Sequence, residues 1–361
     1  MANTRRIAEL DFLRAIAILL ILLHHSPDYV GEMPLLAYWE HGITTVGLGG
    51  FSFLTGYALE HSYGKATHFE WKPFLFKRLW RVYIPYLFTF GVFLFLFGHL
   101  KVHHDVALHP WHISLPVHVV GLQALLFPKY PQCLTLWYIG ILLPMYLAYP
   151  LLNWQRHLSY FLTSAAVMLF LALLIRYVFH IIDIRFFLYF PVFLMGILWC
   201  RLRIMGSTSL RKVASKPSVS WLTLICFVLG YALYMEVWGE PVIYDHGQGD
   251  NTLFFALPIL LTLMLIAFSL VSILTFSRHL ADNKRYKILS TSLSYIGAGS
   301  FFIYLFHRPW LAVYTAVIGH HFGSLALTLG YPFAVAILIV FCNLGEKLYV
   351  SRVYKPMISA Q

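Results

Sequence analysis

The sequence predicts an all-α integral membrane protein with about ten transmembrane helices and both termini in the cytoplasm. Of its 361 residues, 60% are hydrophobic and only 11% are charged, whereas a water-soluble domain carries about 25% charged residues on its solvated surface. Apolar runs long enough to cross a bilayer recur along nearly the whole chain, and each such run predicts a transmembrane helix. We therefore expect a single membrane domain over residues 1–361.

Hydropathy places the spans, in chain order, at 8–26, 41–60, 81–100, 136–153, 157–180, 185–201, 218–237, 250–275, 288–312 and 326–345. With the N-terminus inside, most Lys and Arg residues lie in the inner segments, as the positive-inside rule describes. The net charge of +11 therefore indicates topology, and no nucleic-acid partner is expected. The first span is not a cleaved signal peptide, because it contains Asp11 and Arg14 and precedes many other spans.

The cysteines and one histidine-rich loop were considered as metal ligands. The four cysteines are scattered without ligand spacing. The predicted outer loop 101–135 contains HHDVALHPWH, which lacks the spacing of a zinc site. We therefore expect no metal. The segment HISLPVHVVGLQALLF in this loop is too short to span a bilayer, so it is expected to lie in the interface or to re-enter the membrane.

Three polar residues of the first span share one helix face. Arg14 and His25 are about three helical turns apart, and Asp11 lies three positions before Arg14, where it can pair with it. His24 points about 100° away and is the poorer candidate. Such groups in a membrane indicate a functional site, where His25 is suited to act as a general base toward a hydroxyl group. The alternative is an interfacial Asp11–Arg14 pair with His25 among the outer head groups.

The ninth predicted span contains a second polar face. Ser300, Tyr304 and His307 follow the spacing i, i+4, i+7, which places them on one side of a helix. His307 is expected at a depth similar to that of His25, so the two histidines could line one pocket. A hydrogen-bonded structural histidine is an equally open interpretation.

The second span is rich in small residues, at Gly47, Gly49, Gly50 and Gly56. Small residues let helix backbones approach closely, so helix packing is the first interpretation. Close approach of the backbone to a ligand, such as a thioester arm, is the alternative.

A cluster of cations lies at the inner end of the third span. Arg78 and Arg81, with Lys77, precede Pro85 in FLFKRLWRVYIPY. Paired arginines match the geometry of phosphate, so a nucleotide-phosphate donor is one candidate ligand. Anionic lipid head groups are the other.

These motifs resemble, in the same order, those of acyltransferase family 3, a family of bacterial multi-pass membrane proteins that modify cell-surface and secreted glycans. ELDFLRAIAILLILLHH places Arg14 and His25 on the family's R-x10-H positions, FLFKRLWRVYIPY is similar to its paired-arginine segment, and LSYIGAGSFFIYLFHRP carries His307 on its late histidine. GLGGFSFLTGY and LWYIGILLPMYLAYPLL are similar to two further motifs. The chain departs from the family pattern at Leu142 and Leu143, which replace an acidic pair, and at Gly49, which replaces an aspartate.

The resemblance implies transfer of an acyl group, preferably acetyl, from cytoplasmic acyl-CoA to a hydroxyl of an extracytoplasmic or lipid-linked sugar, in the bacterial inner membrane. The expected partners are the bilayer, acyl-CoA and a glycan, with no prediction of oligomeric state. The residues expected to take part are the catalytic set Asp11, Arg14, His25 and His307 and the donor-binding set Lys77, Arg78, Arg81, Ser300 and Tyr304. The alternatives are a transporter or flippase for a small or lipid-linked solute, which uses the polar stripe as a path, and a structural subunit of a glycan-export complex.

Overall fold

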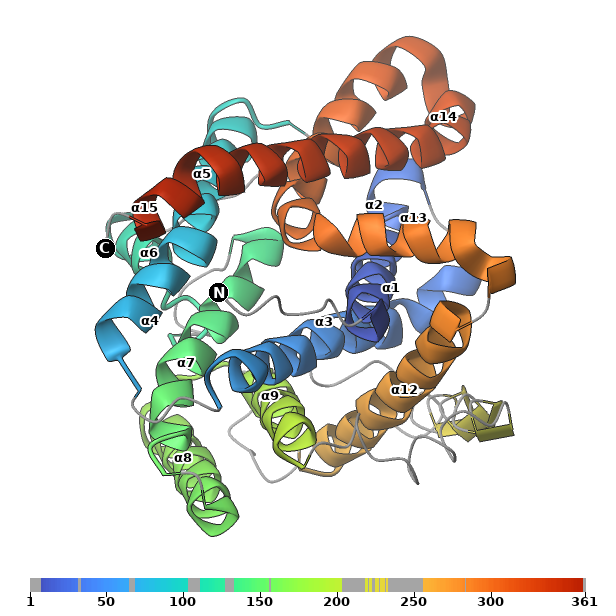
Figure 1. Ribbon diagram of the computed structural model, residues 1–361. Helices are drawn as coiled ribbons and strands as arrows, with labels where there is room; N and C mark the ends of the chain where they lie inside the picture. The colour runs from blue at the N-terminus through green and yellow to red at the C-terminus, as the bar shows by residue number, and fades with distance from the viewer. Residues whose placement is uncertain are drawn as a thin grey trace.

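The computed structural model describes residues 8–31, 34–64, 69–102, 111–126, 133–155, 157–202, short pieces between 218 and 232, 256–282 and 284–359. Within these ranges the regular structure is helical, without strands, which confirms the predicted all-α class (Figure 1). The α-helices used below are α1 Ala8–His24, α2 Pro27–Val30, α3 Pro34–Tyr63, α4 Trp71–Arg78, α5 Ile84–Phe93, α6 Trp111–Val120, α7 Trp137–Leu152, α8 Leu158–Phe179, α9 Phe186–Arg201, α12 Ala256–Asp282, α13 Lys287–Ala298, α14 Ser300–Tyr349 and α15 Lys355–Ser359. Short 3-10 turns cover Leu134–Leu136 and Lys284–Tyr286, and π-helical turns cover Leu79–Tyr83, Leu94–His99 and Val350–Tyr354.

Four helical stretches of the described chain are long and apolar enough to cross a membrane: Trp71–His99, Leu158–Phe179, Pro258–Ala281 and Ser300–Ser359. The helices α7 and α9 are apolar but shorter. These findings agree with a membrane protein, whereas the number of about ten spans and the side on which the termini lie stay predictions. The predicted span 218–237 lies largely outside the described residues.

The predicted span 288–312 is not one helix. It is broken at Gly299, which separates α13 from α14. A side chain at this position would collide with Asn343 on the later part of α14, so glycine is the residue that fits there. The helix α14 itself reverses direction at Gly323, whose φ of 79° is accessible to glycine at little cost. Figure 1 shows the two limbs of α14 lying against each other, and the second limb covers the predicted span 326–345.

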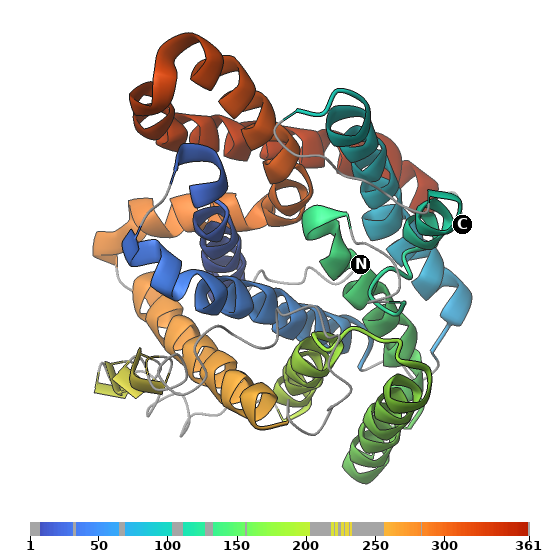
Figure 2. The same ribbon diagram turned by 180° about the vertical axis from the view of Figure 1, so that it is seen from behind.

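The first helix is the centre around which the site is built. In Figures 1 and 2, α1 and α3 lie between the pair α13 and α14 on one side and the pair α9 and α12 on the other. The contacts between α1 and α3 and between α3 and α9 are extensive. The helix α8 lies at the rim and exposes most of its apolar side chains, as expected for a helix that faces lipid.

The glycines of α3 serve helix packing. A side chain at Gly56 would collide with the backbone carbonyl of Phe193 on α9, and a side chain at Gly47 would press on Ala17 of α1. Gly49 and Gly50 face Ile266 of α12 and Ala17, respectively. Close helix packing therefore accounts for these residues, and the alternative that they approach a ligand is wrong for this face of α3.

The predicted short helix of the loop 101–135 is α6, which packs into the protein. His118 is fully buried, its Nδ1 lies 2.8 Å from the carbonyl oxygen of Ser114, and its Nε2 accepts a hydrogen bond of 2.9 Å from the backbone N–H of Cys133. Burial lowers the pKa of His118, so the ring is neutral near pH 7. The described residues contain no cluster of potential metal ligands, and His103, His104 and His109 lie outside them.

Candidate active site

Three arginines from two distant segments of the chain line one cavity of about 210 Å³, which we call the arginine cavity. Arg14 comes from α1, Arg78 from α4 and Arg81 from the π-helical turn that follows it. The remaining wall is mostly apolar and aromatic, and it is formed by Phe51, Leu54, Thr55, Ala58, Leu59, Val82, Tyr138, Ile139, Leu142, Tyr146, Ser300, Phe301 and Tyr304. None of these described wall residues is acidic, so the cavity is suited to an anion with an apolar extension.

A second cavity of about 370 Å³, the polar cavity, adjoins the first. The two share the wall residues Arg14, Ala58, Arg81, Ser300 and Phe301. The polar cavity also contains Asp11 and His61. In the topology predicted from the sequence, the segment that carries Arg78 and Arg81 faces the cytoplasm.

Each arginine has a different partner. Arg14 Nη1 lies 2.6 Å from Asp11 Oδ1, which confirms the pair expected from their spacing. Arg81 Nη2 forms an ion pair with Glu346 Oε1, from the second limb of α14. The Arg78 guanidinium lies 5.8, 5.5 and 5.4 Å from the ring centres of Tyr63, Phe74 and Tyr146.

Aromatic faces attract a cation without neutralising it. Among the described residues Arg78 forms no ion pair, and its buried Nε has no hydrogen-bond partner. Arg78 therefore keeps its full charge available for a ligand in the arginine cavity. Lys77, in contrast, is absent from the described walls of both cavities.

The first turn of α14 faces both cavities through Ser300. The free backbone N–H groups of a helix start carry partial positive charge, which adds to the field of the arginines. Tyr304 lies one turn further along and forms part of the arginine cavity. Its hydroxyl donates a hydrogen bond to the backbone carbonyl of Thr135, which fixes the ring across the end of the cavity.

The two candidate histidines contact each other next to Tyr304. The rings of His25 and His307 are stacked, with centroids 5.2 Å apart and planes inclined by 17°. Both side chains are buried, and His307 has no solvent exposure. The two histidines therefore contact each other, and the expectation that they line one pocket stays a prediction.

An arginine and an aspartate complete this site. Arg308 Nη2 lies 2.9 Å from His25 Nδ1, and Arg308 Nη1 lies 2.8 Å from Asp28 Oδ2. On the opposite side of the pair, His307 Nδ1 lies 2.7 Å from the carbonyl oxygen of Tyr304. The histidine pair is thus held from one side by a cation and from the other by the backbone of α14.

The arginine cavity and the histidine pair are separate in this structure. Of the residues that the structure describes, His25 and His307 line neither cavity. Tyr304 lies between them, with its ring 5.9 Å from that of His307 and 5.9 Å from that of Tyr138. Tyr304 therefore borders both the arginine cavity and the histidine pair.

Sequence reasoning missed Arg308, Asp28 and Glu346. Arg308 directly follows His307 in a predicted apolar span, and a charged residue at such a place is itself an indication of a site. Glu346 is also a charge at the edge of an apolar run, but its contact with Arg81 joins residues 265 positions apart, which no local pattern reveals.

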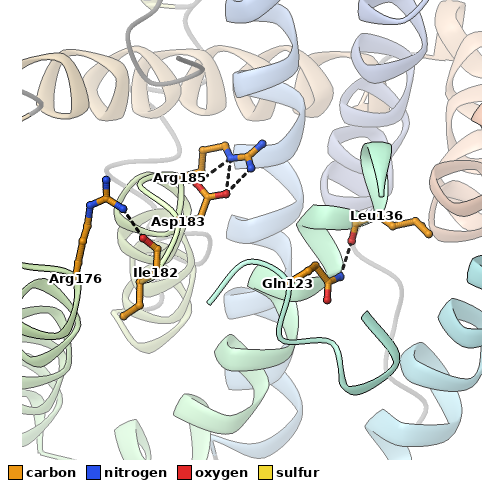
Figure 3. Close-up of polar contacts among 6 residues, drawn as sticks. All are labelled: Gln123, Leu136, Arg176, Ile182, Asp183 and Arg185. Atoms are coloured by element: carbon orange, nitrogen blue, oxygen red, sulfur yellow. Dashed lines mark hydrogen bonds and ion pairs between the residues drawn. The ribbon is translucent and has the colours of Figure 1, made fainter. Parts of the chain in front are cut away.

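A further buried ion pair joins Arg185 to Asp183 (Figure 3). Arg185 Nε donates hydrogen bonds of 2.9 Å to both carboxylate oxygens of Asp183, and the Arg185 guanidinium lies 3.7 Å from the centre of the Trp137 ring. Arg176 and Gln123 nearby donate to backbone carbonyls of Ile182 and Leu136 (Figure 3). These contacts fix the loop that precedes α9, although Gln123 Oε1 and Arg176 Nε have no partner among the described residues, so we assign them a structural role.

The fold and the site define an α-helical membrane protein in which a cation-lined cavity adjoins a buried pair of histidines. The family model described as an acyltransferase domain matches residues 7–344, which is nearly the whole chain. The chain therefore belongs to acyltransferase family 3, as its motifs indicated, and it has the general role of an acyltransferase. No curated protein and no solved structure matches the chain significantly.

Proposed function

We propose that this protein transfers an acyl group, preferably acetyl, from acyl-CoA to a hydroxyl of an extracytoplasmic or lipid-linked sugar in the bacterial inner membrane. The observation that carries the proposal is the arginine cavity, because it combines three cations with an apolar wall and ends at Tyr304, one helical turn before His307. Acyl-CoA has the matching chemistry, with phosphates at one end and an uncharged thioester arm at the other.

The arginines would hold the phosphates of the donor. Arg78 is the principal candidate because aromatic rings surround it without neutralising it. Arg14 and Arg81 retain donors beyond the single carboxylate that each contacts. Ser300, at the start of α14, lines the same cavity.

The thioester arm would then pass along Phe51, Leu54 and Thr55 of α3 and along Ile139 of α7. The glycines of α3, in contrast, contact neighbouring helices. The uncharged wall lowers the cost of removing the arm from water and directs the thioester toward Tyr304.

The chemistry requires one proton transfer. The acceptor hydroxyl oxygen attacks the thioester carbonyl carbon, a C–O ester bond forms and the C–S bond breaks. A histidine takes the hydroxyl proton and returns it to the departing CoA thiolate, so the products are the acylated sugar and free CoA. The buried pair of His25 and His307 is the part of the described chain suited to this step. Asp11 acts indirectly, by orienting Arg14.

The test is the release of free CoA by the purified protein in lipid nanodiscs, with acetyl-CoA and with or without a cell-envelope glycan extract. We expect glycan-stimulated release, and we expect the double substitution Arg78→Ala/Arg81→Ala to raise KM for acetyl-CoA by about tenfold or more, since each lost charge-assisted hydrogen bond costs about 1.5–3 kcal/mol. Lys77→Ala is the matched control, because it removes a neighbouring cation outside the cavity walls. A folded protein that binds no acetyl-CoA would reject the proposal in favour of a transporter, which moves its solute without releasing CoA.

A further inference from the structure

We propose that the two histidines divide the chemistry: His307 accepts the proton of the acceptor hydroxyl at Nε2, and His25 donates a hydrogen bond from its Nε2–H to the thioester carbonyl oxygen. The inference rests on the proposed acyl transfer and deepens it by assigning a role to each ring. It reverses the expectation from sequence, in which His25 was the general base.

The contact with Arg308 shows which ring nitrogen of His25 carries the hydrogen. A guanidinium has N–H donors and no acceptor. Because Arg308 Nη2 lies 2.9 Å from His25 Nδ1, Nδ1 must present its lone pair to the arginine. Asp28 Oδ2 is 3.5 Å from the same nitrogen, which is too far for a good hydrogen bond, and it instead holds Arg308 at 2.8 Å. The neutral His25 ring therefore carries its hydrogen on Nε2.

In His307 the hydrogen is on the other ring nitrogen, Nδ1, because this atom faces a backbone carbonyl. The carbonyl oxygen of Tyr304 lies 2.7 Å from His307 Nδ1 and can only accept, so Nδ1 carries the hydrogen. The lone pair of the neutral ring is then on Nε2. This atom is buried and has no hydrogen-bond partner among the described residues, which is a costly arrangement for a polar atom.

His118 shows what a structural histidine looks like in the same protein. Its Nδ1 also lies 2.8 Å from a backbone carbonyl, that of Ser114, but its Nε2 accepts a hydrogen bond from the backbone N–H of Cys133. The fold thus satisfies both nitrogens of His118 and leaves Nε2 of His307 for a ligand. The acceptor hydroxyl supplies the missing donor.

The two assignments give the acyl transfer a balanced proton path. His307 Nε2 takes the hydroxyl proton as the oxygen attacks the carbonyl carbon, and His25 Nε2–H stabilises the negative charge that develops on the carbonyl oxygen. When the C–S bond breaks, the protonated His307 returns the proton to the CoA thiolate. The ring of His25 stays neutral throughout, with its hydrogen on Nε2, because the contact with Arg308 prevents Nδ1 from taking a second hydrogen.

Glutamine substitutions separate the two roles, because the glutamine amide can donate a hydrogen bond but cannot act as a base near neutral pH. We expect His25→Gln to keep kcat for glycan-dependent CoA release within about tenfold of the wild type, and His307→Gln to lose about 100- to 10,000-fold, the contribution of a general base. His25→Ala should fall well below His25→Gln, whereas His307→Gln and His307→Ala should be equally poor. If His307→Gln retains more activity than His25→Gln, the assignment is overturned.

Chemical rescue is the second measurement. Added imidazoles should restore activity to His307→Ala, with a rate that increases with the basicity of the added imidazole, and should not do so for His25→Ala. His118→Gln is the structural control: it should lower thermal stability and show no rescue. Rescue of His25→Ala alone, or equal rescue of His118→Gln, contradicts the proposal. A folded wild-type protein that releases no CoA overturns the proposed function itself, and this result is distinct from an active wild type in which the histidine roles are exchanged.

Discussion

Glu346 illustrates, at the residue scale, how this chain accommodates its departure from the family pattern. Leu142 and Leu143 occupy the places of an acidic pair, and Leu142 lies in the wall of the arginine cavity. The carboxylate that contacts Arg81 comes instead from Glu346 on α14. Aromatic rings, rather than an acid, surround Arg78. Among the described residues, Arg14 and Arg81 are therefore paired with carboxylates and Arg78 is not.

Substitution of Arg308 by alanine should reduce kcat about 10- to 100-fold. The lost interaction is a charge-assisted hydrogen bond to His25, and such a bond contributes about 1.5–3 kcal/mol. The KM for acetyl-CoA should stay unchanged, because Arg308 is outside the described walls of both cavities. Steady-state kinetics in nanodiscs measures both constants.

A rise in KM without a fall in kcat would show that Arg308 binds the donor instead of positioning His25. Asp28→Asn is the companion variant: it weakens the hold on Arg308 and should reduce kcat in the same direction but by a smaller factor.

Among the helices, the contact of α14 with the turn before α7 lies between the donor cavity and the two histidines. Tyr304 on α14 closes the end of the arginine cavity through its hydrogen bond to Thr135, just before α7. Under the proposed function, the Tyr304 side chain has to turn aside so that the thioester can reach the histidines. The break at Gly299 gives this first turn of α14 its own direction, separate from that of α13.

Replacement of Tyr304 by alanine should uncouple the reaction. With the ring removed, water and the thioester meet near the histidine pair without an acceptor, so glycan-independent release of CoA should increase several-fold relative to acylated product. The ratio of free CoA to acylated glycan measures this effect. An unchanged ratio, with normal binding of acetyl-CoA, would show that Tyr304 does not separate the two sites.

The packing of α3 on α9 gives a prediction about stability. Gly56→Ala should destabilise the protein by about 1–3 kcal/mol, as overpacking does, because the new methyl group would collide with the carbonyl of Phe193. Gly91→Ala on α5 is the control, since nothing lies within 4 Å of the position that its methyl group would occupy. Thermal unfolding in detergent compares the two, and an equal melting temperature for both variants would contradict the described helix contact.

At the scale of the whole molecule, sidedness is the property that the proposed function needs most. Acyl-CoA must enter from the cytoplasm and the acyl group must leave on the other side. Reporter fusions that are active on one side of the membrane should place both termini in the cytoplasm, together with the segment around Lys77. A periplasmic signal from one terminus alone would mean that the number of spans is odd. The side of the membrane that the arginine cavity faces would then have to be assigned again.

Properties that depend on local spacing and composition could be predicted from the amino-acid sequence. Hydrophobic runs predicted a helical membrane protein, and helical periodicity predicted both the pairing of Asp11 with Arg14 and the shared face of Ser300, Tyr304 and His307. These predictions are confirmed because residues three to seven positions apart in a helix have fixed relative directions, whatever the rest of the fold does.

The contacts between distant segments could be seen only in the tertiary structure. The stacking of His25 on His307 and the contact of Arg308 with His25 join residues about 280 positions apart, and the rotation of α3 decided that its glycines face other helices while Phe51 and Thr55 face the cavity. Helical periodicity defines faces but not their neighbours. The neighbour of each face depends on the packing of all helices together, and for the same reason the proton positions on the two histidines follow from contacts that no single segment contains.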